Sequence, residues 1–189
     1  MLAVCILAGG LATRLRPLTE TIPKALVDVA GKPFIDWQLR YLKDQGVEQV
    51  VICAGYLGEQ IQAAVGDGSA WGLSVQFAFD GDTLLGTGGA VRRALPLLGE
   101  DFFILYGDSY LPVNFATVQQ DYFRQQKPAL MTVLRNGGRW DRSNVLFQDG
   151  RLVAYNKAAP TPQMDYIDYG LGVMRASVLA ARPVLRRLE

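Results

Sequence analysis

Residues 7–19 read LAGGLATRLRPLT, and this stretch leaves an apolar run, places two glycines together and then adds two arginines and a proline. Paired glycines let a chain turn sharply or approach a ligand closely, and their N–H groups can face an anion. The stretch is therefore either a tight strand exit followed by a solvated loop or the floor of a pocket with cations directed into it. The rest of the sequence bears on this choice.

Apolar runs alternate with helical patterns along the chain. The apolar runs predict buried strands at residues 2–7, 49–54, 73–79, 101–106 and 129–135. The spacing of apolar residues predicts helices at 34–46, 57–65, 88–98 and 114–126, the last with Asn114 as its N-cap. Asp149 and Gly150 then separate two alternating runs, which is a hairpin signal. We predict an α/β fold, a Rossmann-like three-layer sandwich with a mainly parallel mixed sheet and an added antiparallel hairpin.

The composition is that of an ordinary soluble domain. The chain has 189 residues, 50% of them hydrophobic and 20% charged, with a formal net charge of +1. These values predict a single domain over residues 1–189. The small net charge argues against a binder of nucleic acid or of a membrane surface, which normally has a basic excess. The absence of histidine excludes histidine-based acid–base catalysis and nearly all zinc sites.

Cellular location is predicted from the N-terminus and the cysteines. MLAVCILAGG lacks a basic region and reaches glycine too early for a signal peptide or a membrane span, so we expect a cytoplasmic protein. Cys5 and Cys53 each lie in an apolar run and are expected to be buried free thiols, with a disulfide as the alternative. A homo-oligomer is left open.

The predicted topology indicates where a ligand binds. In an open α/β sheet, ligands bind beyond the carboxyl ends of the parallel strands. Residues 8–10, 54–56 and 107–108 are exits at those ends, so the opening stretch lies on the expected functional edge. A dinucleotide-dependent oxidoreductase is one alternative, but G-x-G-x-x-G is absent and the run VICAGY (51–56) ends without the expected acidic residue.

The loop after the paired glycines suits a polyphosphate. Arg14, Arg16 and Lys24 supply positive charge, and Pro17 and Pro23 stiffen the chain that carries them. The loop is not a Walker loop, because G-x-x-x-x-G-K-[ST] is absent. The glycine pair taken alone is more typical of a strand exit than of a phosphate site.

The longer string is more specific than its parts. LAGGLATRLRPLTETIPKALVDVAGKPFIDWQL (7–39) closely resembles the N-terminal signature of the sugar-phosphate nucleotidyltransferases, and LLGTGGAV (84–91), ILYGDSYL (104–111), YNK (155–157) and IDYGLGV (167–173) extend the resemblance. Enzymes of that family join a nucleoside triphosphate to a sugar 1-phosphate and release pyrophosphate. The forms GDSYL and IDYG look most like the bacterial branch that activates mannose-type sugars, including heptose 1-phosphates, with GTP.

The resemblance implies a role for each matching residue. Nucleotide contacts are expected from Leu7, Ala8, Gly9, Gly10, Thr13, Arg14, Gly86 and Thr87. Contacts with the sugar phosphate are expected from Lys24, Lys157 and Asp168, the last facing the sugar hydroxyls from a strand end, and Asn144 is a further candidate at the sugar end. Asp108 is expected to hold Mg²⁺, and Arg14, Lys24 and Asp108 form the predicted catalytic set.

The chemistry of the implied reaction agrees with this residue set. The attacking sugar phosphate is already an anion at neutral pH, so the reaction needs no general base and therefore no histidine. It needs neutralisation of two approaching anions and of the departing pyrophosphate. Arg14, Lys24 and Lys157 supply positive charge, and a magnesium ion held by an acidic residue completes it.

Two alternative functions remain open, and the sequence differs from the family pattern at two places. The same reaction with UTP or dTTP and a hexose or N-acetylmuramate 1-phosphate remains open, as does a nucleotide-binding module with weak or no turnover. Ala12 stands where the family usually has glycine, which costs about 1 kcal/mol if the position needs a positive φ. Family members run on beyond residue 189, so we expect the usual C-terminal segment and its second metal-binding aspartate to be missing, with a final helix at 176–187 interrupted near Pro183.

Overall fold

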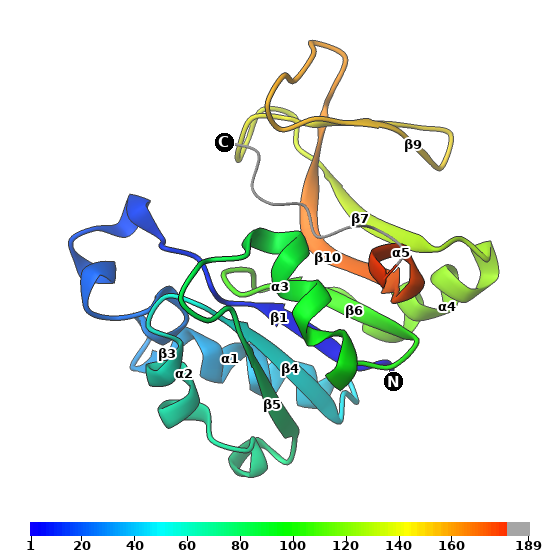
Figure 1. Cartoon of the computed structure of the whole chain (residues 1–189). Helices are drawn as coiled ribbons and strands as arrows, with labels where there is room; N and C mark the ends of the chain where they lie inside the picture. Colours follow the sequence, from blue (N-terminus) through cyan, green and yellow to red (C-terminus); the bar gives the residue numbers. More distant parts are fainter. Residues whose placement is uncertain (181–189) are drawn as a thin grey trace.

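Four parallel strands form one half of the main sheet in this computed structural model, which describes residues 1–180. They are β1 (Val4–Leu7), β4 (Gln49–Ala54), β5 (Ser74–Phe79) and β6 (Asp101–Tyr106). The other half contains β7 (Ala129–Arg135), β8 (Val145–Gln148), β9 (Arg151–Tyr155) and β10 (Tyr166–Arg175). The sheet order is β5-β4-β1-β6-β10-β8-β9, with β7 also paired to β10 (Figure 1).

The direction of each strand pair gives a mixed sheet. β1 pairs in parallel with β4 and β6, and β4 pairs in parallel with β5. β10 runs antiparallel to β6, β7 and β8. The predicted strand at 129–135 therefore exists, but it belongs to the antiparallel half. Two short strands, β2 (Asp28–Val29) and β3 (Lys32–Pro33), form a separate pair.

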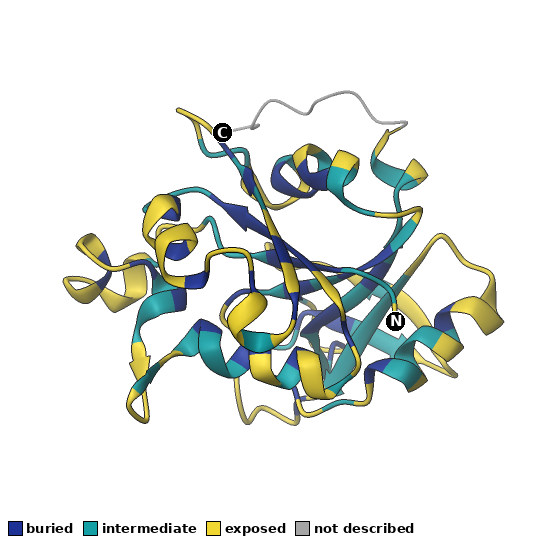
Figure 2. Ribbon diagram, turned by 90° about the horizontal axis from the view of Figure 1, so that it is seen from below, coloured by how far each residue is buried: buried dark blue, intermediate teal, exposed yellow. Residues whose placement is uncertain are grey.

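Alternating side chains on the strands build two cores, one on each face of the sheet. Val4 and Ile6 of β1 face a core shared with α1 (Phe34–Asp44), α2 (Gly58–Val65) and α4 (Phe115–Gln125). Cys5, between them, faces a second core with α3 (Gly86–Ala94) and α5 (Ser177–Ala180). Figure 2 shows the buried central strands and the exposed outer sides of the helices. The predicted three-layer sandwich is confirmed.

The helices form where apolar spacing predicted them, with different ends. In α1, Ile35, Leu39 and Leu42 are buried at helical spacing. Asn114 caps α4 as predicted, because its Oδ1 accepts a hydrogen bond from the backbone N–H of Thr117 at 2.8 Å. The helix predicted at 88–98 begins earlier and ends at Ala94, where a 3₁₀ turn, Leu95–Leu97, follows because it contains a proline.

The C-terminal third contains the predicted hairpin. Asp149 and Gly150 have φ values of 49° and 74° between β8 and β9, as a two-residue hairpin turn requires. Only α5 represents the helix predicted at 176–187, and the remainder of that segment lies outside the described residues. In residues 1–180, no helix has the length and apolar character needed to cross a bilayer. Cys5 and Cys53 are buried and free, as predicted, with their Sγ atoms 3.4 Å apart.

Candidate active site

A pocket of about 530 Å³ opens at the carboxyl ends of the parallel strands. Its lining comes from the exits of β1, β4, β5 and β6, from the loop after β1 and from the start of α3. The residues that line it are Leu7, Ala8, Gly9, Gly10, Leu11, Ala12, Thr13, Arg14, Leu15, Lys24, Ala25, Cys53, Asp80, Leu84, Gly86, Thr87, Ala90, Tyr106, Gly107 and Asp108. The structure thus brings together every predicted nucleotide contact and the whole predicted catalytic set.

Glycines form the floor because the strand exits lie close together. A Cβ on Gly9 would lie 3.0 Å from the backbone N of Gly55, and one on Gly107 would lie 2.6 Å from the carbonyl oxygen of Leu7. Gly10 differs, because a Cβ there would meet no described atom within 4 Å. The first two glycines therefore serve packing of the backbone, whereas Gly10 leaves open space beside the pocket.

Arg14 lies in a loop that three short turns hold in place. The 3₁₀ turns are Thr13–Leu15, Leu18–Glu20 and Lys24–Leu26. The buried Thr19 donates its hydroxyl to the carbonyl oxygen of Ala12 at 2.9 Å, and the hydroxyl of Tyr56 donates to the carbonyl oxygen of Glu20 at 2.7 Å. These bonds tie the loop to itself and to the exit of β4, so they fix the backbone that carries Arg14.

Ala12 has the strained conformation that the sequence suggested. Its φ is 46° and its ψ 43°, in the left-handed region that costs an L-residue about 1–2 kcal/mol. We expect Ala12→Gly to raise the free energy of unfolding by about 0.5–1 kcal/mol, because relief of strain exceeds the entropy that glycine loses. Chemical denaturation measures this change.

Two further alanines serve as controls for that experiment. Ala30→Gly, at φ 53° in the turn between β2 and β3, should stabilise similarly. Ala63→Gly, at an exposed position inside α2, should destabilise by about 0.5–1 kcal/mol because glycine is a poor helix former. Loss of stability in Ala12→Gly would contradict strain at this position.

Lys24 and Asp108 meet at the mouth of the pocket. Lys24 Nζ lies 2.8 Å from Asp108 Oδ2, and the two side chains are 41% and 46% exposed. A partly exposed pair of this kind contributes about 0–1 kcal/mol to stability. Each group therefore remains available to exchange its partner for a ligand of opposite charge.

The start of α3 completes the nucleotide side of the pocket. Gly86 begins the helix with a φ of 70°, and Thr87 follows it in the lining. The first N–H groups of a helix carry partial positive charge, which favours anions and hydrogen-bond acceptors there. The roles of both residues remain predictions.

Asp80 and Tyr106 line the pocket but were not among the predicted site residues. Asp80 is 6% exposed and its Oδ2 accepts the Leu85 N–H at 3.1 Å; burial raises the pKa of its carboxyl. A sequence signal existed for Asp80, because it directly follows an apolar strand in the way that Asp108 follows the next parallel strand. No comparable signal marked Tyr106, the last residue of β6.

The predicted sugar-phosphate residues divide between two places. Lys24 lines the pocket, whereas Lys157, Asp168 and Asn144 do not. Asp168 is not at a strand end as expected but is the third residue of β10, where the pairing with β7 shifts register before Gly172. Tyr106 joins the two places, because its hydroxyl donates to Asp168 Oδ2 at 2.9 Å.

Asn144 lies beside the segment that carries Lys157. Its N–H donates to the carbonyl oxygen of Tyr166 at 3.0 Å, and its carbonyl oxygen accepts the N–H of Asn156 at 2.9 Å. Its side-chain Oδ1 is buried and has no hydrogen-bond partner in the described part of the chain. The structure therefore shows a backbone role for Asn144, and its predicted contact with the sugar remains a prediction.

The donor set around Asp108 fits a magnesium ion that arrives with its substrate. Mg²⁺ is usually bound in nucleotide sites by one or two carboxylates together with phosphate oxygens and water. Asp108 offers an exposed carboxylate paired with Lys24, in the pocket that Arg14 also lines and where a triphosphate is expected. Within residues 1–180, no group of three or more acidic, cysteine or histidine side chains could hold a metal by itself. Binding of a metal ion by Asp108 remains a prediction.

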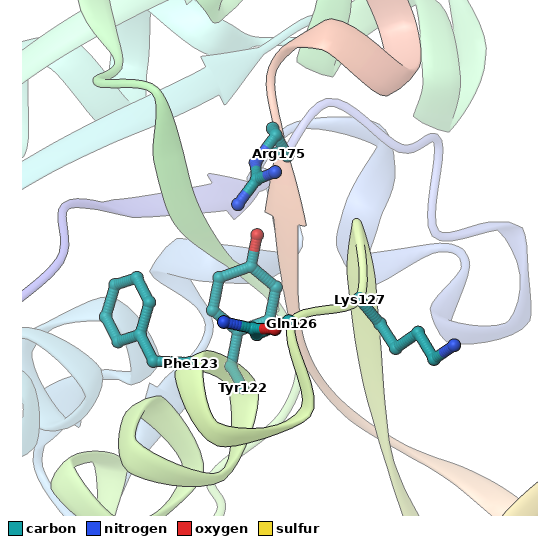
Figure 3. Close-up of a pocket in the computed structure, with 5 residues that line it drawn as sticks. All are labelled: Tyr122, Phe123, Gln126, Lys127 and Arg175. Atoms are coloured by element: carbon teal, nitrogen blue, oxygen red, sulfur yellow. The ribbon is translucent and has the colours of Figure 1, made fainter.

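A second hollow, of about 300 Å³, lies at the opposite edge of the sheet (Figure 3). There Asp101, the first residue of β6, accepts hydrogen bonds from the hydroxyl of Tyr122 at 2.5 Å and from Arg175 Nε at 3.1 Å. Burial raises the pKa of Tyr122 to about 12, so its hydroxyl stays protonated. In Figure 3 the Tyr122 hydroxyl points toward Arg175 and Lys127 points away from both. These contacts tie α4 to β6 and β10, far from the glycine-lined pocket.

Comparison with known proteins agrees with this geometry. A family model described as "Nucleotidyl transferase" matches residues 3–139. The chain is 45% identical over 116 residues to the N-acetylmuramate alpha-1-phosphate uridylyltransferase of Neisseria meningitidis, covering 61% of this chain and 50% of the relative. It is 30% identical over 154 residues to the D-glycero-alpha-D-manno-heptose 1-phosphate guanylyltransferase of Aneurinibacillus thermoaerophilus, covering 80% and 66%.

Solved structures give the same result for the fold. The crystal structure of HddC from Yersinia pseudotuberculosis complexed with GMP-PN superimposes with a TM-score of 0.81 and 26% identity, over 97% of this chain and 80% of that one. The chain spans half or less of the N. meningitidis relative and of a UTP–glucose-1-phosphate uridylyltransferase from Synechocystis, at 50% and 36% of their lengths. Because the family model matches most of its residues, the chain belongs to the nucleotidyl transferase family.

Proposed function

We propose that the protein transfers a nucleoside monophosphate from a nucleoside triphosphate to a sugar 1-phosphate. A phosphate oxygen of the sugar phosphate attacks the α-phosphorus, a P–O bond forms, and the bond to the β-phosphate breaks with release of pyrophosphate. The observation that carries this proposal is the convergence of Arg14, Lys24 and Asp108 at the mouth of one glycine-lined pocket.

The pocket's own residues supply what this displacement requires. Arg14 offers a planar guanidinium that suits two phosphate oxygens at once, so we assign it to the β- and γ-phosphates. Lys24 offers a point charge that can follow the α-phosphate as it is attacked, when it exchanges Asp108 for the phosphate. Magnesium bound with the triphosphate would neutralise further phosphate charge beside Asp108.

The buried carboxylate of Asp80 offers a means of selecting the base. A carboxylate only accepts hydrogen bonds, and the described residues give its Oδ1 no donor. Uracil, thymine and guanine each present a ring N–H donor on the pairing edge, whereas cytosine and adenine present a ring nitrogen acceptor there. We therefore propose a base of the first group, and the relatives named above include uridylyl and guanylyl transferases.

GTP, UTP and dTTP are the three candidates within that group, and the sequence and the relatives named above bear on the first two. The sequence forms GDSYL and IDYG favour GTP with a heptose or mannose 1-phosphate, and the solved relative with GMP-PN supports this assignment. The 45% identity to an N-acetylmuramate 1-phosphate uridylyltransferase supports UTP and that sugar instead. Guanine has a second donor beside its ring N–H, which could reach the same carboxylate.

A panel assay tests the proposed reaction directly. Pyrophosphate release is measured for GTP, UTP, dTTP, CTP and ATP, each with heptose, mannose, glucose and N-acetylmuramate 1-phosphates and with Mg²⁺. We expect release only when a sugar 1-phosphate is present, and only with the first three nucleotides. Tight binding of a triphosphate without release for any acceptor would leave a nucleotide-binding module and overturn the proposed activity.

Asp80→Asn is expected to weaken base selection. The amide oxygen can replace the carboxylate toward the Leu85 N–H, which leaves an NH₂ donor where an acceptor is needed. We expect the preference of kcat/KM for the best nucleotide over CTP to fall by about 10–100-fold. Asp82→Asn, at an exposed position two residues away that does not line the pocket, is the matched control and should change nothing.

The same substitution should raise stability. Because the pKa of Asp80 is raised in the folded protein, the folded state binds its proton more tightly than the unfolded state. The contribution of the Asp80 carboxyl to the free energy of unfolding is therefore greatest below its pKa in the unfolded chain, near 3.8. This contribution is lost as the pH rises through its pKa in the folded protein. At pH 7 the buried charge costs stability, so Asp80→Asn should have a higher melting temperature at pH 7 and a smaller advantage at acid pH.

A further inference from the structure

The carboxylate of Asp168 is almost fully occupied by its own protein. Oδ2 accepts hydrogen bonds from the hydroxyls of Tyr106 at 2.9 Å and Tyr155 at 3.4 Å, and Oδ1 accepts the Gly170 N–H at 3.0 Å. The Asp168 side chain is 8% exposed. Two carboxylate oxygens have about four acceptor sites, so little capacity remains for hydroxyls of a ligand.

The remaining partner of Asp168 is Lys157. Its Nζ lies 3.9 Å from Asp168 Oδ2, and 5.3 Å and 5.7 Å from the ring centroids of Tyr106 and Tyr155. Both distances to the rings are within the range of cation–π attraction. The Lys157 side chain is nevertheless 57% exposed, so the ammonium lies beside three groups of the protein and stays open to solvent.

The backbone of β10 is shaped to admit Tyr106. Gly170 has a φ of 95° and lies where the pairing of β10 with β7 shifts register. A Cβ on Gly170 would lie 3.3 Å from Tyr106 Cδ2 and 2.8 Å from Ser109 Oγ. A side chain there would crowd the ring, so this glycine lets Tyr106 lie against β10 and reach Asp168.

Tyr106 also lines the pocket in which we place the triphosphate. Tyr106 thus lines the nucleotide side of the pocket and also donates a hydrogen bond to Asp168, the partner of Lys157. Burial raises the pKa of Tyr106, and the nearby charge of Asp168 raises it further, so the hydroxyl remains a donor at working pH.

We propose that Tyr106 and Asp168 are positioning residues that hold the Lys157 ammonium for the phosphate of the acceptor sugar, and that Asp168 does not itself bind the sugar. This inference rests on the proposed function for the identity of the acceptor. Lysine loses considerable rotamer freedom when a ligand fixes it, and a lysine fixed beforehand loses less. The hydroxyl and amide donors around Asp168 also reduce the repulsion that its charge would exert on an anionic acceptor.

The first test is a double-mutant cycle. Tyr106→Phe removes the hydroxyl and keeps the ring, and it should raise the KM for the sugar 1-phosphate about 5–10-fold while the KM for the triphosphate changes less than about 2-fold. Tyr155→Phe is the matched control and should have a smaller effect, because its hydroxyl is farther from Asp168. In a Lys157→Met background, Tyr106→Phe should have no further effect on this KM.

A direct sugar contact or a general structural role gives a different pattern. In both cases, Tyr106→Phe or Asp168→Asn would raise the KM for the sugar 1-phosphate as much in the Lys157→Met background as in the unmodified protein. That additivity would overturn the positioning role. Loss of the effect in the double variants would support it.

The second test needs no turnover. The NMR shift of the Lys157 ε-methylene protons is measured without substrate, the resonance being identified by its loss in Lys157→Met. The rings of Tyr106 and Tyr155 should move it upfield, and Tyr106→Leu should return it toward the random-coil value. An unshifted resonance in the unmodified protein would overturn the positioning role. A shift that depends on Tyr106, in a protein that uses no sugar 1-phosphate, would support positioning while the proposed function fails.

Discussion

Asp108→Asn is expected to lower kcat by at least about 100-fold while the protein remains folded. The substitution keeps the size of the side chain and removes the charge that we propose as the protein's ligand for magnesium. Asp108 is also the only carboxylate paired with Lys24 in the described ion pairs, so the substitution removes the charged partner of that ammonium, while the amide oxygen can still accept its hydrogen bond. Turnover is measured by pyrophosphate release across a magnesium titration.

Folding should survive because the affected groups lie at the surface. The side chains of Asp108 and Lys24 are both close to half exposed, and pairs of this kind add about 0–1 kcal/mol to stability. The melting temperature therefore separates lost catalysis from lost structure. Asp82→Asn removes an exposed carboxylate outside the pocket and should keep full activity. Near-normal turnover of Asp108→Asn with an unchanged magnesium requirement would place the metal elsewhere.

The pocket could be predicted from the sequence because its main residues lie directly after parallel strands. Gly9, Arg14 and Asp108 belong to segments that leave parallel strands, and all such strands end at one edge of the sheet. Their meeting needed no knowledge of side-chain packing. Asp80 obeys the same rule after β5 and could have been found by applying it to every acidic residue at a strand exit.

The acceptor side could not be anticipated in the same way. Tyr106 reaches Asp168 across 62 positions of sequence, and the contact depends on how β10 pairs with β6 and β7. A register shift lies between Asp168 and Gly172, and hydrophobic alternation does not predict such irregularities. The resemblance implied that Asp168 faces the sugar hydroxyls from a strand end, and nothing in the sequence indicated that tyrosine hydroxyls occupy its carboxylate.

Lys24 makes a contact that changes what its removal should do. Lys24 Nζ lies 2.8 Å from Asp108 Oδ2, so a metal ion at Asp108 would have to compete with this ammonium for the carboxylate before substrate binds. Binding of a magnesium-bound triphosphate would therefore free Lys24 for the α-phosphate as the metal takes Asp108. Such an exchange would make the Lys24 charge available to the α-phosphate when the metal-bound triphosphate binds.

Lys24→Met is accordingly expected to have opposite effects on chemistry and on metal affinity. We expect kcat to fall by at least about 100-fold, because the charge is needed most when the α-phosphorus is attacked, with little change in the KM for the triphosphate. Arg14→Ala should instead raise that KM, because we assign its charge to the β- and γ-phosphates, which it would contact in both ground and transition states. Magnesium should bind the substrate-free Lys24→Met protein more tightly, since no ammonium must be displaced.

Lys24→Arg separates these two expectations. It keeps the positive charge beside Asp108, so metal affinity should stay close to that of the unmodified protein, while kcat should recover only in part because a guanidinium is larger and more rigid than an ammonium. Calorimetric titration with Mg²⁺ gives the affinity, and single-turnover kinetics give the chemical step. A Lys24→Met protein with a raised KM and an unchanged kcat would show that Lys24 binds substrate without stabilising the transition state. Unchanged metal affinity in the same protein would show that the Lys24–Asp108 pair does not oppose the metal.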